Sequence, residues 1–383
     1  MTIATSTHLA DGRELIYFDD GQHAKAHTAL DTRPLDPRSE ENTGELRFDA
    51  LTGDWVAIAA HRQTRTYLPP ANQCPLCPTT GENLSEIPDS SYDVAVFENR
   101  FPSLGPALGA IAQAPVWGTK GRAFGRCEVV AFTPEHTGSF GGLSTQRART
   151  VIDAWAQRTE ALSALPGIKQ VFPFENRGQD IGVTLHHPHG QIYAYSYVPP
   201  RSAVMATAAL KHFQAHDGRE TLLGSIVSKE SASGERMIAQ GKHFSAYVPF
   251  AAHMPLEIHL TPHRQVADFT ALNDAERDEL AVMYLDVLRR VDNLYDTPTP
   301  YIAAWHQAPL DSALRAPGRL HLELTSPRRA ADKLKFLAGS EAAMGAFIND
   351  TTPEQTAAVL RATSTALKAP AGAKVTDQKV RIR

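Results

Sequence analysis

Apolar and polar side chains alternate with a period of two along residues 189–195. Ile192 and Ala194 fall on one side of this segment, and the residues between them fall on the other. The pattern predicts a β-strand whose successive side chains point to opposite faces of a sheet. His187 and His189 share one face, and the proline between them cannot donate to a strand ladder. We therefore expect this segment at a strand end or a sheet edge, where a substrate can reach it.

Other apolar runs and helical periodicities predict the elements around this strand. One predicted helix begins near Ser144, and a second begins at Asn273, with Glu276 three residues later in a capping-box arrangement. Short apolar runs bounded by turn residues predict further strands at 46–49, 55–59, 126–132, 168–174 and 300–305.

The order of these elements repeats along the chain. A strand, a Thr-Pro dipeptide, a helix, a strand and a motif follow one another over residues 132–191, and a similar order runs over 260–324. This repetition predicts an α+β protein built from two duplicated halves, with mostly antiparallel sheets, one per half, and helices packed on one face. We place the halves at 44–200 and 201–368.

The two ends of the chain lack this periodicity. Residues 1–43 are polar and show no sustained pattern, so we expect a loosely ordered N-terminal arm. Residues 369–383 form a basic tail, for which we expect mobility.

Composition limits the classes of function. A chain of 383 residues is long for a single core, which agrees with two halves. The net charge of −4 gives no reason to expect a nucleic-acid or anionic membrane partner. Apolar runs are too short to span a bilayer, and residues 1–4 do not resemble a signal peptide, so we expect a cytoplasmic protein.

The strongest candidate for chemistry is the run from His187 through Pro188, His189 and Gly190 to Gln191. A neutral imidazole, with an ordinary pKa of about 6.5, is a nucleophile that can attack phosphorus and later act as a leaving group. A His-x-His pair can equally be half of a metal site. The residues alone do not separate a nucleophile from a ligand.

This run, followed by an aromatic residue, resembles the active-site motif of the galactose-1-phosphate uridylyltransferase branch of the histidine triad superfamily. The resemblance extends over about residues 46–341. It implies histidine-triad-like halves, a homodimer, and ping-pong transfer of a uridylyl group from UDP-glucose to galactose 1-phosphate. His189 would be the nucleophile, and Gln191 would donate a hydrogen bond to a phosphoryl oxygen.

A Cys-x-x-Cys pair, Cys74 and Cys77, points to a metal, because this spacing in a cytosolic chain is better explained by a metal than by a disulfide. Structural zinc needs two more ligands, and Cys127, His136 and His187 are the candidates. The family resemblance selects His136 and His187, and it implies a structural zinc that would fix the turn presenting the nucleophile.

The resemblance also implies a set of substrate-binding residues. Two arginines three positions apart are often only a solvated surface, but they lie in a segment, 51–65, that is similar to a phosphate-binding stretch of the family. The implied substrate-binding residues are Arg62, Arg65, Asn99, Asn176, Thr184 and Lys335.

The second half matches a further metal site of some family members only in part. His306 and His321 fit two of its positions, whereas Glu323 replaces a histidine and Met205 falls about where a glutamate is required. Methionine is a poor ligand for such metals, so we do not expect this site to be occupied. Glu323 also stands in the place of the nucleophile, so we expect covalent chemistry only in the first half.

Four readings compete with this one. They are a related nucleotidyltransferase or phosphorylase acting on ADP-sugars or dinucleoside polyphosphates, a histidine triad hydrolase, a zinc-stabilised binding protein without catalysis, and a nucleic-acid-binding zinc module. The acidic balance and the single Cys-x-x-Cys disfavour the last.

Overall fold

The computed structural model describes residues 2–21, 25–37, 44–64, 68–106 and 114–367. Arg65 and the basic tail at 369–383 lie outside these residues. The described part is an α+β structure dominated by one antiparallel sheet, as predicted. The strands in their order across this sheet are β1 (Ile3–His8), β2 (Glu14–Asp19), β5 (Val94–Glu98), β7 (Gly125–Ala131), β9 (His189–Tyr195), β8 (Gln170–Arg177), β13 (Tyr301–His306), β14 (His321–Ser326), β12 (Leu256–Pro262), β11 (Phe244–Tyr247) and β10 (Met237–Gln240).

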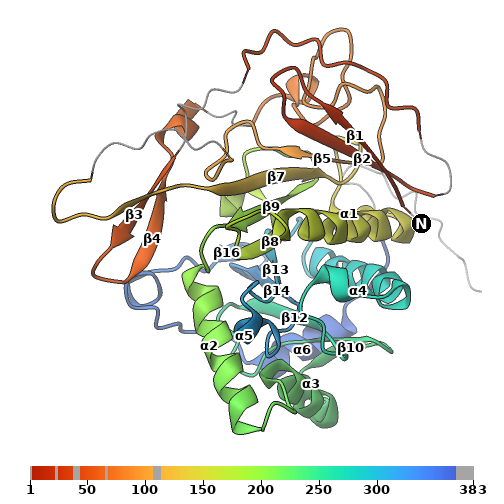
Figure 1. Cartoon of the computed structure of the whole chain (residues 1–383). Helices are drawn as coiled ribbons and strands as arrows, with labels where there is room; N and C mark the ends of the chain where they lie inside the picture. The colour runs from red at the N-terminus through yellow and green to blue at the C-terminus, as the bar shows by residue number, and fades with distance from the viewer. Residues whose placement is uncertain (1, 22–24, 38–43, 65–67, 107–113, 368–383) are drawn as a thin grey trace, which may run out of the picture.

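The duplication is visible in this order. In chain order, β7, α1 (Thr145–Ser163), β8 and β9 are matched by β12, α4 (Asp274–Asn293), β13 and β14. In each half the last strand lies between the other two. We expected one sheet per half, but β8 pairs with β13, with Asn176 opposite Ile302, so both halves share one sheet (Figure 1).

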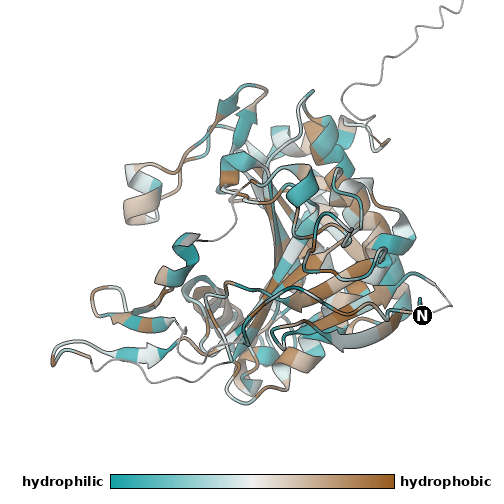
Figure 2. Ribbon diagram, turned by 90° about the horizontal axis from the view of Figure 1, so that it is seen from above, coloured by the Kyte–Doolittle hydropathy of each residue, from teal (hydrophilic) through white to brown (hydrophobic). Residues whose placement is uncertain are grey.

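Both long helices begin as their sequences predict. The Ser144 side chain accepts a hydrogen bond from the backbone N–H of Arg147, and Asn273 forms a reciprocal capping box with Glu276. The two helices and α6 (Pro353–Ala362) cover one face of the sheet, where Trp155 and Trp305 lie in the main core. Figure 2 shows the apolar strands and helices packed together on this side and irregular segments on the other.

Smaller helices lie in the second half. The two longer ones, α2 (Pro200–Ala215) and α3 (Leu222–Ser233), pack against each other, and a short helix, α5 (Ser312–Arg315), contacts α2. Val227 of α3 meets Met237 and Tyr247 in a small core on the opposite face of β10 and β11. No described helix is both long enough and apolar enough to cross a membrane.

The N-terminal arm is the main correction to the prediction. Residues 3–19 form the hairpin of β1 and β2, which turns at Gly12 with a φ of +85° and joins the main sheet through β5. The strand β2 is buried on both faces, so it shows a continuous apolar run, Leu15–Phe18, in place of the alternation we searched for. That run was the missed signal.

Two small sheets complete the fold of the described residues. The strands predicted at 46–49 and 55–59 are confirmed as β3 (Glu45–Asp49) and β4 (Asp54–Ile58), which pair as a hairpin, and β6 (Lys120–Arg122) adds a third strand. The other small sheet pairs β15 (Arg328–Ala330) with β16 (Lys333–Leu334).

Candidate functional site

The predicted strand at the motif is β9, which begins at His189. Its residues alternate between buried and half-buried positions, which confirms the period-two pattern. His189 and Gln191 lie on the face that α1 does not cover, because Ile192 and Ala194 belong to the core beneath that helix. The strand is central in the sheet, between β7 and β8, so Pro188 marks a strand end and not a sheet edge.

Gly190 is required by close packing. A Cβ atom at this position would lie 2.6 Å from Cζ of Phe132 and 2.9 Å from the carbonyl oxygen of Phe174. Both distances are too short for a side chain. The absence of one lets β9 lie tightly against its neighbours, which fixes the height of His189 and Gln191 above the sheet.

The His189 ring is held in one orientation. Its Nδ1 lies 2.7 Å from the carbonyl oxygen of His187, so Nδ1–H is the donor and Nε2 keeps its lone pair. Burial lowers the pKa of His189, and the hydrogen bond to His187 only partly opposes this shift. The ring is therefore neutral near pH 7, with Nε2 unprotonated.

A cavity of about 230 Å³ lies over this face and contains His189 and Gln191 in its wall. Three of the predicted substrate-binding residues, Arg62, Asn99 and Thr184, line the same cavity. Arg62 belongs to a 3₁₀ helix, Ala60–Thr64, that follows β4. Segments that are far apart in the sequence therefore converge on the imidazole.

Two other predicted residues, Asn176 and Lys335, do not line this cavity. Asn176 lies on β8, the strand beside β9, and Lys335 is buried with its Nζ 3.1 Å from a carboxylate oxygen of Glu341. Arg65 is outside the described residues.

Cys74, Cys77, His136 and His187 form a group whose potential ligand atoms all lie within 4.8 Å of one another. Sγ of Cys77 is 3.5 Å from Nδ1 of His136 and 3.6 Å from Nδ1 of His187. Two thiols and two imidazoles match the ligands and number of a structural metal site. Cys127, the alternative candidate, is buried elsewhere, beside Ser103.

The surroundings of His187 suit a metal ligand. Its Nε2–H donates to the carbonyl oxygen of Thr133 at 2.7 Å, which leaves Nδ1 facing the two sulfurs. Burial and the neighbouring Cys74 raise the pKa of Cys77 to about 12, so the two sulfurs become thiolates together only when a cation compensates their charge. This site could hold a metal two residues before His189.

The second half contains a different cluster. Glu257, His259 and Glu323 are close enough to share a metal, and of these the sequence analysis named only Glu323. An Nη2 atom of Arg201 lies 2.7 Å from each carboxylate oxygen of Glu323, so a guanidinium already neutralises that group. His306 is 3.6 Å from the same carboxylate.

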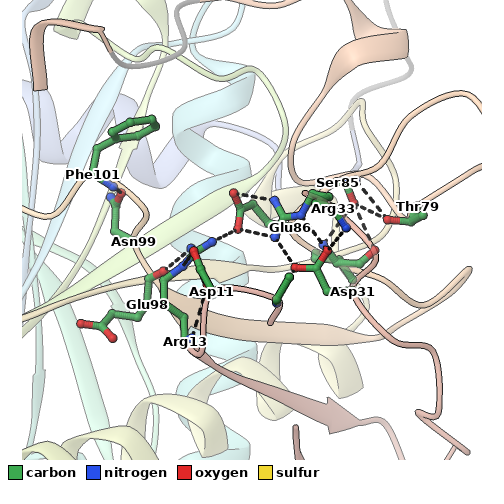
Figure 3. Close-up of polar contacts among 12 residues, drawn as sticks. Asp11, Arg13, Asp31, Arg33, Thr79, Ser85, Glu86, Glu98, Asn99 and Phe101 are labelled. Carbon is green, nitrogen blue, oxygen red and sulfur yellow. Dashed lines mark hydrogen bonds and ion pairs between the residues drawn. The ribbon is translucent and has the colours of Figure 1, made fainter. Parts of the chain in front are cut away.

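Sequence reasoning also missed part of the cavity wall. Arg33, Glu86 and Arg100 line the cavity as well. Arg33 belongs to the arm that we expected to be loosely ordered, and Figure 3 shows it paired with Glu86 and Asp31. An Asp-x-Arg sequence is common on surfaces, so the chain offers no local signal for this role.

Comparison with known proteins agrees with this geometry. Residues 34–199 match the N-terminal domain of galactose-1-phosphate uridyl transferase, and residues 207–371 match its C-terminal domain. A galactose-1-phosphate uridylyltransferase from Streptomyces lividans is 46% identical over 331 residues, which are 84% of this chain and 87% of the relative. A solved uridylyltransferase is 31% identical with a TM-score of 0.73, over 83% of this chain and 97% of that one.

An ADP-glucose phosphorylase from Arabidopsis thaliana, solved with bound ADP-glucose, has a TM-score of 0.63 over 84% of this chain and all of its own. Its identity is 22%, so this likeness shows a shared fold and no more.

Proposed function

Since the chain belongs to the galactose-1-phosphate uridylyltransferase family, and is a transferase of that class, we propose that its reaction runs through a covalent uridylyl-histidine at His189. The substrates are UDP-glucose and galactose 1-phosphate. The observation that carries the mechanism is the His189 ring, whose Nδ1–H is engaged with the backbone while Nε2 is left with a lone pair on the cavity side of the sheet.

Two displacements at the α-phosphorus make up the reaction. Nε2 of His189 attacks this phosphorus, a P–N bond forms, and the P–O bond to glucose 1-phosphate breaks. A phosphate oxygen of galactose 1-phosphate then attacks the same phosphorus, a P–O bond forms, and the P–N bond breaks. UDP-galactose leaves, and His189 returns to its neutral state.

The other cavity residues bind and orient the nucleotide. The Gln191 amide donates to a non-bridging phosphoryl oxygen, where negative charge grows in the transition state. Arg62 neutralises phosphate charge, and Asn99 and Thr184 supply hydrogen-bonding groups to the same cavity. Asn176, on the strand beside β9, and Arg65 would also contact the phosphates.

The metal in the Cys74 group is zinc in this proposal, with His136 and His187 completing four ligands. It has a structural role. Bound to His187, a zinc would fix the residue whose carbonyl oxygen accepts from His189, and this hydrogen bond orients the nucleophilic ring.

We also propose a homodimer in which Lys335 acts on the sugar phosphate near the subunit contact. Large apolar side chains are exposed beside Lys335, including Phe336, which is 73% exposed, and Met344, which is 80% exposed. Sedimentation of the full chain tests this, and a monomer at micromolar concentration would contradict it.

The central experiment uses UDP-glucose labelled in the α-phosphate. We expect the protein to acquire a label that is stable to base and labile to acid, and that galactose 1-phosphate removes. His189→Gly abolishes the label, whereas His186→Gly, at an exposed histidine of the same segment, keeps it. If wild-type protein acquires label from ADP-glucose and not from UDP-glucose, the proposed substrate is wrong.

A further inference from the structure

The cavity at His189 is closed on one side by the N-terminal segment of the chain. His27 anchors this segment, because its ring stacks on Tyr17 with centroids 3.9 Å apart and its two nitrogens contact Asp19 and Asp89 at 3.0 and 3.1 Å. Six residues later Arg33 enters the cavity wall. It lies before residue 34, where the match to the family begins.

Two carboxylates hold the Arg33 side chain rigidly (Figure 3). Nε and Nη2 contact the two oxygens of Asp31 at 2.9 and 2.7 Å. Glu86 accepts from Nη2 at 3.1 Å and lies 2.9 Å from Nη1. A guanidinium has five N–H groups, so at least one on Nη1 makes no hydrogen bond within the described part of the chain.

Glu86 is itself held in place by a second arginine, Arg13. Nη2 of Arg13 contacts a Glu86 oxygen at 2.6 Å, and Nη1 of Arg13 donates to the carbonyl oxygen of Glu98 at 2.8 Å. Arg13 is 2% exposed, so this network is part of the buried structure. The Arg33 side chain is therefore preorganised, and it loses little conformational entropy when it binds a ligand.

The floor of the cavity connects Arg33 with the motif. Across neighbouring strands, Gln191 pairs with Val129, Val129 pairs with Phe97, and Phe97 pairs with Leu15, two residues after Arg13. From β9 to β5 this row covers two strand spacings, about 10 Å. That length is comparable to a nucleoside, and Val129 and Phe97 offer an apolar surface for the face of a base.

Charge decides what Arg33 can bind at this end. Asp31 and Glu86 compensate the guanidinium, so the corner offers a hydrogen-bond donor with no excess of positive charge. An anionic phosphate would gain little binding free energy beside Arg33, because the guanidinium charge is already compensated and the carboxylate of Glu86 repels the phosphate. A neutral carbonyl oxygen on the edge of a base fits the remaining N–H.

We propose that Arg33 is a specificity-determining residue that donates a hydrogen bond to the position-4 carbonyl oxygen of uracil, and so selects uracil over cytosine. This inference rests on the proposed function. Uracil has a carbonyl at position 4, whereas cytosine has an amino group there, which cannot accept this hydrogen bond. The N-terminal segment is then part of the nucleotide pocket.

The test compares UDP-glucose with CDP-glucose as donors for the wild type and Arg33→Ala. The variant raises KM for UDP-glucose by roughly tenfold to a hundredfold, the effect of losing one charge-assisted hydrogen bond, and the preference for UDP-glucose falls by a similar factor. The KM for galactose 1-phosphate is unchanged, because this substrate enters after the nucleotide is bound covalently.

The matched control is Arg149→Ala. Arg149 also contacts three carboxylates, those of Asp153, Asp274 and Asp278, but it lies on α1, on the other face of the sheet. This variant keeps both KM and the preference. If Arg33→Ala does not fold, Arg33→Gln tests the same ratio.

An unchanged preference in a folded Arg33 variant, with both donors weakened equally, overturns the inference and leaves Arg33 a purely structural role. The labelling experiment keeps the two proposals apart. If wild-type protein acquires label from UDP-glucose and the variant keeps its preference for UDP-glucose, the role of Arg33 is wrong and the proposed function still stands.

Discussion

The starts of β9 and β14 look alike and differ in what surrounds them. Each strand begins with a histidine whose Nδ1 donates to the carbonyl two residues earlier, His189 to His187 at 2.7 Å and His321 to Arg319 at 3.0 Å. The motif alignment placed Glu323 opposite the nucleophile. The strand register agrees with this alignment, because His189 pairs with Ala131, two residues before Thr133, and Glu323 pairs with His259, two residues before Thr261.

The difference lies in access and in neighbours. His189 lines a cavity beside Arg62 and Gln191, whereas His321 is 6% exposed and stacks on His306 with ring centroids 5.0 Å apart. Burial and the nearby histidines lower the pKa of His321 to about 3. A neutral, oriented imidazole is therefore not sufficient for nucleophilic chemistry. It also needs space and donors for a phosphate.

The largest effect should separate these two histidines directly. His189→Asn removes the nucleophile, and we expect the rate of uridylyl transfer to fall by on the order of 10⁴-fold or more. His321→Asn keeps the rate within a few-fold, because that ring is not in the wall of the cavity that contains His189. Steady-state kinetics on both variants decide this, and a comparable loss in His321→Asn would remove the distinction between the halves.

The next effect concerns the metal, which we assign to the first half. Wild-type protein should contain one zinc per chain, and Cys77→Ala should lose it along with several kcal/mol of unfolding free energy. Cys127→Ala, also at a cysteine, and His321→Asn should retain the zinc. Elemental analysis and denaturant unfolding measure both quantities. Full zinc content in Cys77→Ala contradicts the assignment.

The strand starts also differ two residues after the histidine, where β9 has the amide of Gln191 and β14 has the carboxylate of Glu323. Gln191→Met keeps the length of the side chain and removes the amide donor, so kcat should fall about 10²- to 10³-fold in both half-reactions. Gln179→Met, at an exposed glutamine near His186, should not change kcat. Single-turnover rates of labelling and label release provide the measurement, and unchanged rates would mean that Gln191 has no part in the transition state.

The smallest expected effect concerns the pairing of β8 with β13, which joins the two halves. Burial raises the pKa of Glu175 on β8 to about 8, and the Tyr301 hydroxyl of β13 donates to its carboxyl group. The unfolded chain ionises this group near its ordinary pKa of about 4.3, so stability is lost as pH rises from there to about 8.

Glu175→Gln removes this titration. Relative to wild type, the variant should therefore gain roughly 1–3 kcal/mol of unfolding free energy between pH 5 and pH 8. Denaturant unfolding at the two pH values checks this, and parallel pH dependences in both proteins would show that Glu175 is not protonated in the fold.

Several features of both halves could be predicted from short segments of the sequence. The alternation in β9, the caps at Ser144 and Asn273, and the Cys-x-x-Cys pair each lie within a short segment, so neighbouring residues reveal them. The family resemblance correctly added His136 and His187 to the group around Cys74.

The N-terminal segment could not be read in the same way. Arg33 has a role only because β2 pairs with β5 and places the segment beside Glu86, and such pairing has no short-range pattern. The sequence analysis also did not predict that β8 pairs with β13, for the same reason.

The sequence by itself determined the chemistry that is available: an imidazole next to a proline and a glycine, an amide two residues on, and a Cys-x-x-Cys pair that could bind a metal. The tertiary structure alone decided which imidazole has a cavity, and which residues of the arm close it. The reason is that backbone periodicity and capping depend on near neighbours, whereas burial and charge compensation depend on contacts between segments that only the folded sheet brings together.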